Sequence, residues 1–123
     1  MPEISKRAIA ISQPALGEEE WHALKDPVLS GWVTQGPKVA EFEQQFAAYH
    51  GVNHAIAVTS CTTGLHLVLK AMGVGHGDEV IVPSFTWVAS ANAVLYCGAT
   101  PVLIDVESKT YNIDIKQLAA KIL

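Results

Sequence analysis

Residues 77–106 read GDEVIVPSFTWVASANAVLYCGATPVLIDV, and they carry the clearest fold signal in the sequence. Apolar residues run through 79–82 and through 102–105, and each run has the length of a buried strand. The segment 86–96 between them is apolar on most of its sides, which is typical of a deeply buried helix. A strand, a helix and a second strand in this order predict a parallel pair of strands with a helical crossover.

Upstream of this stretch, the sequence predicts two helices joined by a glycine-containing loop. Gly17 is followed by three glutamates and suits a helix start, whereas Pro27 is expected to break or restart that helix. Pro37 suits the first turn of the second helix, and Gly51 suits its C-terminal cap. The second helix is expected to bury one apolar stripe, which consists of Val39, Phe42, Phe46 and Tyr49.

Residues 55–59 predict a third apolar strand, which leads into a helix. A last helix is expected near the end of the sequence, capped by Asn112 or Asp114. Strands that are nearly all apolar and alternate with helices predict an α/β fold with a mostly parallel sheet and helices on both faces. With three clear strands, the sheet is expected to be incomplete, as the front of a larger domain.

Composition narrows the classes of function. Half of the 123 residues are hydrophobic, 16% are charged, and the formal net charge is −4. Since the sequence contains no basic block, nucleic acid is not an expected partner. It also has neither an apolar run of transmembrane length nor a signal-peptide core, which predicts a cytoplasmic protein without membrane association. The two cysteines, Cys61 and Cys97, have no metal-ligand spacing and are expected to be small, half-buried fillers, so no metal site is predicted.

The segment TSCTTGLH at 59–66 is the first candidate site. An apolar strand ends and a helix begins there, so unpaired backbone N–H groups and the helix dipole favour an anion. The hydroxyls of Thr62 and Thr63 add donors, and Gly64 allows close approach of a bulky group. These features predict a phosphate-binding cup, with ordinary helix capping by Ser60 or Thr62 as the alternative.

Two other segments are candidates for ligand contact. Trp87 follows the carboxyl end of a predicted strand, where ligands of open α/β sheets bind, and its ring suits the wall of a pocket for a flat ligand. The alternative is a tryptophan of the hydrophobic core. Trp32 and Thr34 lie in the loop SGWVTQGP and suit a substrate contact or a plain surface loop. Asp105 is a candidate acid at a strand end, with a turn or cap role as its alternative.

Taken together, two long stretches resemble one family of enzymes. They are SGWVTQGPKVAEFEQQFAAYHG at 30–51 and AVTSCTTGLHLVLKAMGVGHGDEVIVPSFTWVASANAVLYCGATPVLIDV at 57–106. Their ordered motifs resemble the DegT/DnrJ/EryC1/StrS family of pyridoxal-phosphate-dependent aminotransferases. The resemblance implies the N-terminal part of the large domain of a fold-type-I pyridoxal-phosphate transferase. It also implies transfer of an amino group from an amino acid, glutamate, to a keto sugar linked to a nucleotide, in polysaccharide or antibiotic sugar biosynthesis.

The resemblance also assigns roles to residues of this sequence. Thr62 and Thr63 match the positions that hold the cofactor phosphate, and Trp87 matches the aromatic residue that stacks on the pyridine ring. The loop with Trp32 and Thr34 resembles a substrate-side loop. The implied division is residues 1–36 for the N-terminal helix and this loop, and residues 37–123 for part of the cofactor-binding α/β domain. A homodimer is the implied assembly.

The family mechanism requires a lysine that bonds to the cofactor and an acid beside the pyridine nitrogen. No lysine or acid of this sequence matches these motifs, so no catalytic residue is assigned. The chain is therefore expected to be inactive by itself. Two alternatives remain open: a non-catalytic module that binds the cofactor or assembles with a partner, and a fragment with no function of its own.

Overall fold

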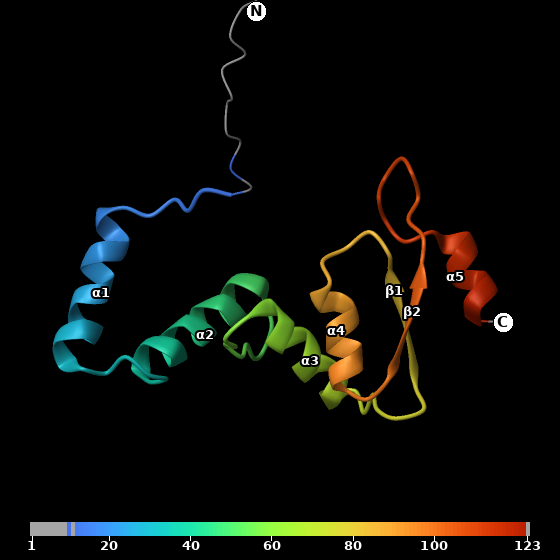
Figure 1. The fold of residues 1–123 in the computed structure, drawn as a ribbon. Coiled ribbons are helices and arrows are strands. Elements are labelled where there is room, and N and C mark those ends of the chain that lie inside the picture. The colour runs from blue at the N-terminus through green and yellow to red at the C-terminus, as the bar shows by residue number, and fades with distance from the viewer. Residues whose placement is uncertain (1–9, 11, 123) are drawn as a thin grey trace, which may run out of the picture. The chain divides into compact units, whose positions relative to one another are not determined.

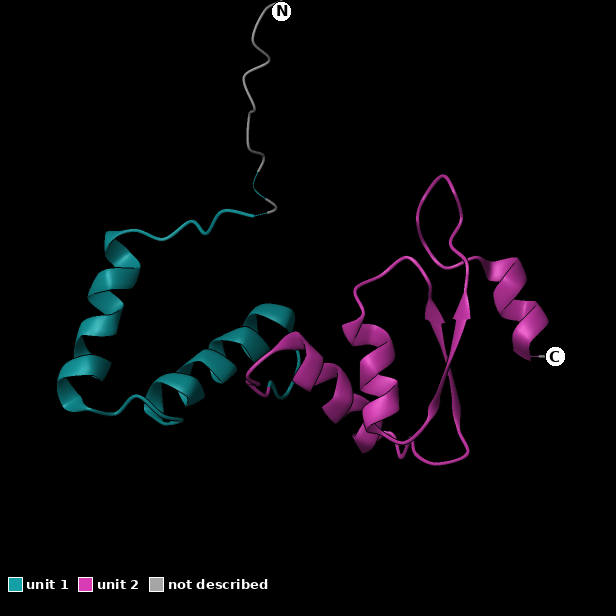
Figure 2. Ribbon diagram, viewed as in Figure 1, with its two compact units in different colours: residues 1–55 teal, residues 56–123 magenta. Residues whose placement is uncertain are grey.

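The computed structural model describes residue 10 and residues 12–122, and the chain divides into two units, residues 1–55 and residues 56–123 (Figures 1 and 2). The predicted division at residues 36 and 37 is a division by role, and it stays a prediction. No helix among the described residues is both long and apolar enough to cross a membrane.

Helix α1, Glu18–Ser30, opens the first unit and starts after Gly17 as predicted. The Glu20 carboxylate accepts a hydrogen bond of 2.6 Å from the backbone N–H of Gly17, and this bond lowers the pKa of Glu20. The prediction that Pro27 breaks or restarts the helix is wrong, because α1 continues through Pro27 to Ser30. A proline removes one backbone donor from a helix, which bends or weakens the helix without always ending it.

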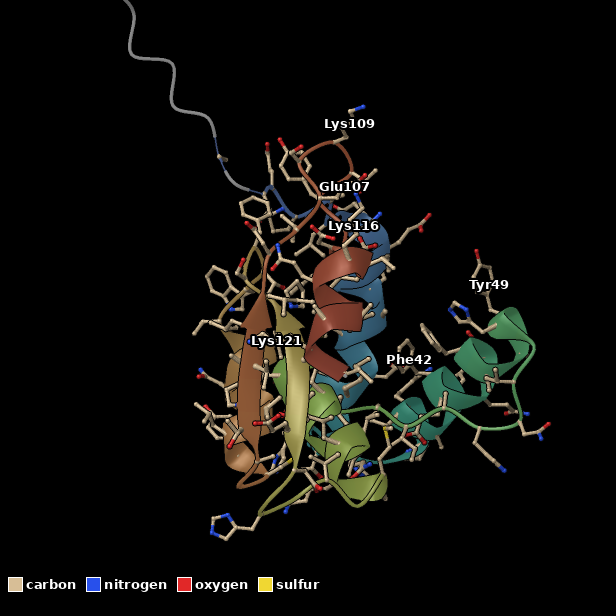
Figure 3. The ribbon with its side chains drawn as sticks, turned by 90° about the vertical axis from the view of Figure 1, so that its right-hand side faces the viewer. Phe42, Tyr49, Glu107, Lys109, Lys116 and Lys121 are labelled. Carbon is tan, nitrogen blue, oxygen red and sulfur yellow. The ribbon has the colours of Figure 1, made fainter. Side chains whose placement is uncertain are left out.

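Helix α2, Pro37–His50, has Pro37 at its first position and Gly51 as a left-handed C-terminal cap with φ of 66°, and both predictions are confirmed. The prediction of a buried stripe is wrong. Phe42 and Tyr49 project from the helix and are 55% and 86% exposed (Figure 3). Among the described residues of the first unit only Ala47 is buried, since no described element of this unit packs over the stripe.

The second unit has a parallel pair of strands, β1 (Glu79–Pro83) and β2 (Thr100–Ile104), joined by helix α4 (Ala89–Tyr96). Helix α3 (Cys61–Ala71) packs against α4, and α4 lies on one side of the strands while α5 (Ile115–Ile122) lies on the other (Figure 1). This arrangement confirms the predicted α/β class with a parallel sheet. Asp114 caps α5, as one of the two predicted alternatives, by accepting a hydrogen bond of 2.8 Å from the backbone N–H of Lys116.

The core of the second unit lies where α4 packs on the strands. It is a cluster of Val82 from β1, Val94 and Cys97 from the end of α4, and Ala99. Cys97 is therefore buried rather than half-buried, and Cys61 is exposed, so the two cysteines do not share the predicted environment. Helix α4 is less buried than its composition predicts, because it touches the strands along one face only.

The structure corrects two predicted elements of this unit. Residues 55–59 form no strand, and the sheet has two strands, β1 and β2. An apolar run becomes a strand only when a neighbouring strand provides the ladder of hydrogen bonds, and neither β1 nor β2 does so for this run. The predicted helix from Thr86 begins three residues later, at Ala89, because residues 84–88 form an irregular link after β1.

The turn between α4 and β2 depends on Gly98, which has φ of 79°. A Cβ atom added there would meet nothing within 4 Å, so backbone strain is the only cost of a side chain. We expect Gly98→Ala to lower the free energy of unfolding by about 1 kcal/mol. Gly98→Asn is the matched control and should lose less, because asparagine tolerates the left-handed region. Urea unfolding followed by circular dichroism measures both, and equal losses would contradict the strain argument.

Candidate functional site

The first turn of α3 carries a cluster of hydroxyl groups. Ser60 caps the helix, and its Oγ accepts a hydrogen bond of 3.1 Å from the backbone N–H of Thr63. The Thr63 hydroxyl lies 3.0 Å from Ser60 Oγ and 3.2 Å from the hydroxyl oxygen of Thr59. Of the two capping alternatives, Ser60 is therefore the cap. Capping also occupies the Thr63 N–H, which the predicted cup would have used as a donor.

Two backbone donors remain at the helix start. The N–H groups of Cys61 and Thr62 have no acceptor among the described residues. Both belong to the first turn of α3, where the helix dipole favours negative charge. Gly64 lies in the same turn and packs against Val58, because a Cβ atom at Gly64 would lie 3.4 Å from a Val58 methyl carbon. The turn thus offers unpaired N–H groups and hydroxyls to a small anion.

The link between β1 and α4 carries Trp87, whose side chain is 78% exposed. The alternative of a core tryptophan is therefore excluded in this chain. The carbonyl of Trp87 accepts a hydrogen bond of 3.0 Å from the N–H of Ser90, which ties the residue to the start of α4. Its ring is free to lie against a flat ligand at the carboxyl end of β1.

A largely apolar hollow of about 390 Å³ lies between α3 and α4. Cys61 and Gly64 of α3 line it together with Ser90 and Ala93 of α4, so the first turns of both helices border one space. Thr62, Thr63 and Trp87 are not among its lining residues. The hollow therefore joins the starts of α3 and α4, near the predicted residues. It does not bring the side chains of Thr62, Thr63 and Trp87 into one lining.

The loop of Trp32 and Thr34 belongs to the first unit, where it borders a hollow of about 230 Å³. The indole N–H of Trp32 donates a hydrogen bond of 3.1 Å to the Gln35 carbonyl, which fixes the ring over Gly36. A Cβ atom at Gly36 would lie 2.4 Å from Trp32 Nε1, so a side chain there would displace the indole ring.

Sequence reasoning missed two charged residues in the lining of this hollow, Asp26 and Lys38. They stand on the two helices that flank the loop, at either side of Trp32. Asp26 and Ser30, which also lines the hollow, are four residues apart on α1, and that helical spacing was an available signal.

Asp105 has the turn role. Its carboxylate accepts a hydrogen bond of 2.8 Å from the N–H of Val106, directly after β2. The backbone N–H of Asp105 donates to the side chain of Gln117 on α5 at 3.0 Å. These contacts join the end of β2 to α5. Among residues 10 and 12–122, no three side chains of histidine, cysteine, aspartate or glutamate come together as metal ligands do.

Comparison with known proteins gives a consistent result. The chain is 47% identical over 111 residues to the spore coat polysaccharide biosynthesis protein SpsC of Bacillus subtilis (strain 168), covering 90% of this chain and 28% of that protein. It is 50% identical over 115 residues to the GDP-perosamine synthase of Caulobacter vibrioides, covering 93% of this chain and 31% of the synthase. The chain thus spans less than a third of the length of these two relatives.

Solved structures show the same fold. The aminotransferase TlmJ from Streptoalloteichus hindustanus superposes with a TM-score of 0.82 at 41% identity, over 93% of this chain and 32% of that one. Spr1654 from Streptococcus pneumoniae, solved in its PLP-form, has a TM-score of 0.85 at 38% identity, over 91% and 29%. The model of the DegT/DnrJ/EryC1/StrS aminotransferase family matches residues 14–123. Because that match spans most of the sequence, and the fold agrees, the chain belongs to the DegT/DnrJ/EryC1/StrS aminotransferase family.

Proposed function

We propose that this chain forms part of the cofactor site of an aminotransferase that uses pyridoxal 5′-phosphate and acts on a keto sugar linked to a nucleotide, with glutamate as the amino donor. Family membership supports the reaction class. The names of SpsC and of the GDP-perosamine synthase support sugar chemistry, and the PLP- and PMP-forms of Spr1654 support the cofactor. The single observation that carries the proposal is the pair of unpaired backbone N–H groups at the start of α3.

The start of α3 fits the phosphate of this cofactor. The N–H groups of Cys61 and Thr62 would donate to phosphate oxygens, and the Thr62 hydroxyl would add a third donor. Thr63 would contribute through its hydroxyl, because its N–H is held by Ser60.

Trp87 fits the ring of the cofactor. Its exposed indole lies at the carboxyl end of β1, where a flat aromatic ligand can stack on it. When bound, the cofactor supplies an electron sink for the carbanion of the amino acid. The lysine and the acid that complete this chemistry match no residue of the sequence, so the proposed contribution of the chain is to bind and orient.

The hollow beside Trp32 and Thr34 is the proposed substrate contact. Asp26 and Lys38 are among its lining residues, and the Lys38 ammonium group lies 3.1 Å from the Glu41 carboxylate. Charged groups of both signs beside the hollow suit a ligand with hydroxyls and phosphates. We extend the proposal to a cytoplasmic homodimer. The exposed aromatic side chains of α2 support an assembly of this kind, because soluble monomers rarely expose large apolar patches.

Equilibrium dialysis of the chain against pyridoxal 5′-phosphate and against pyridoxal tests the proposal. We expect saturable binding of the phosphate ester and at least tenfold weaker binding of pyridoxal, since one charge-assisted hydrogen bond is worth about 1.5–3 kcal/mol. Trp87→Ala should weaken binding by about five- to hundredfold, because aromatic stacking is worth about 1–3 kcal/mol. Trp87→Phe is the matched control and should retain most of the affinity.

Two outcomes would contradict this proposal. Equal binding of both ligands would remove the role of the α3 turn, and equal binding by Trp87→Ala and Trp87→Phe would remove the role of the ring. Borohydride reduction followed by intact-mass measurement separates binding from chemistry, and we expect no lysine adduct. If the chain does not bind the cofactor but sedimentation shows a stable dimer, the alternative of a non-catalytic assembly module is favoured.

A further inference from the structure

The link before Trp87 is held at three consecutive positions. The backbone N–H of Ser84 donates a hydrogen bond of 2.8 Å to the carbonyl of Ile104, which extends the ladder to β2. The hydroxyl of Thr86 lies 3.3 Å from that of Ser90 on α4. The anchors of Ser84 and Thr86 therefore come from β2, which pairs with β1, and from α4, which follows the link.

The anchor of Phe85 comes from a different segment. Its ring lies against the ring of Tyr111, with the centroids 5.5 Å apart and the planes tilted by 35°. Such offset pairs attract through their ring quadrupoles as well as by burial. Phe85 is 69% exposed and Tyr111 is 63% exposed, so burial in the core does not force this contact. The two rings meet because the parallel strands β1 and β2 end at the same edge of the sheet.

The backbone of Tyr111 is unusual. It has φ of 58°, and it is the one non-glycine residue with positive φ in the described part of the chain. Bulky residues rarely occupy this left-handed region unless the surrounding structure holds them there.

Here the turn 107–112 holds Tyr111. The N–H of Tyr111 donates to the carbonyl of Glu107, and the N–H of Glu107 donates to the carbonyl of Asn112, both at 2.8 Å. The Thr110 hydroxyl donates to the Glu107 carboxylate, also at 2.8 Å. Figure 3 shows Glu107 on this turn and Lys109 at its outer end, away from the strands. These bonds hold Tyr111 in its left-handed conformation.

We infer that Tyr111 is a positioning residue, which holds the link 84–88 through its ring contact with Phe85 and thereby restrains the segment that carries Trp87. The ring contact adds a third anchor to the link, between the hydrogen bonds of Ser84 and Thr86. The inference about Trp87 order stands on these contacts alone. Its consequence for cofactor binding rests on the proposed function.

The test uses the 123-residue chain with Trp21→Phe and Trp32→Phe, which leaves Trp87 as the single tryptophan. Time-resolved fluorescence anisotropy measures the order of the indole without any ligand, and quenching by pyridoxal 5′-phosphate measures binding. Tyr111→Asn removes the ring and keeps a residue that accepts positive φ, whereas Tyr111→Phe keeps the ring. Phe85→Leu removes the partner ring and leaves the turn 107–112 unchanged.

Tyr111→Asn and Phe85→Leu should each lower the residual anisotropy of Trp87 and weaken cofactor binding by about threefold to tenfold, the equivalent of one aromatic pair. Tyr111→Phe should match the reference in both. If both ring-deleting variants remain folded by circular dichroism and keep the reference anisotropy, the inference is overturned. If the Tyr111→Asn variant does not fold, the residual anisotropy of Trp87 in the Phe85→Leu variant tests the inference alone. If the reference does not bind the cofactor, the proposed function fails while the anisotropy still decides the inference.

Discussion

Replacing Cys61 by proline is expected to weaken the binding of pyridoxal 5′-phosphate by about tenfold to hundredfold. Proline has no backbone N–H, so the substitution deletes one of the two unpaired donors at the start of α3. A hydrogen bond to a charged group is worth about 1.5–3 kcal/mol, which corresponds to this loss of affinity. Equilibrium dialysis with the phosphate ester measures it.

The helix itself should tolerate this change. Cys61 is the first residue of α3, where proline is common because that N–H makes no intrahelical bond. Ser60 has φ of −162° and ψ of 162°, the extended conformation that a residue before proline prefers. Cys61→Ala is the matched control, since it removes the thiol and keeps the N–H. If Cys61→Pro binds as well as Cys61→Ala, the backbone donor has no part in phosphate binding.

Replacing Val94 by aspartate should abolish stable folding of the second unit. Val94 is 1% exposed and belongs to the cluster that joins α4 to the strands. A charge left unpaired in such a place costs about 3–5 kcal/mol, a large share of the stability of a small domain. Urea unfolding followed by the helical circular dichroism signal should show a transition shifted to much lower denaturant or lost altogether.

Leu95→Asp is the control for helix propensity and net charge. Leu95 is the next residue of α4 and is 55% exposed, so its aspartate would remain in water. We expect its unfolding transition to lie close to that of the unsubstituted chain. Comparable destabilisation by the two substitutions would mean that the cluster around Val94 does not hold the unit together.

Local signals in the sequence predicted the element ends well. Gly17, Pro37, Gly51 and Asp114 each lie at the predicted start or end of a helix. These signals act within a turn or two, through caps and backbone geometry that do not depend on the rest of the fold. The strands β1 and β2 were found for a related reason, because two apolar runs separated by one helix leave few other arrangements.

The site was predicted in part. The sequence placed Thr62 and Thr63 at a helix start and Trp87 after a strand, and the structure has both placements. It left open whether Ser60 or Thr62 caps α3, because both hydroxyls suit that task. The contact of Phe85 with Tyr111 had no local signal, since it joins segments that meet only after the strands have paired.

Sequence signals alone therefore indicated the family, the order of the helices and of β1 and β2, most helix ends and the residue types available for a cofactor. Tertiary structure alone decided which apolar residues are covered. Residues 55–59 have strand composition without a pairing strand, and the aromatic stripe of α2 is apolar without a covering element. Tertiary structure also brought the starts of α3 and α4 to one hollow. Periodicity shows which face of an element can be buried, whereas burial and pairing require a partner surface that only the folded chain supplies.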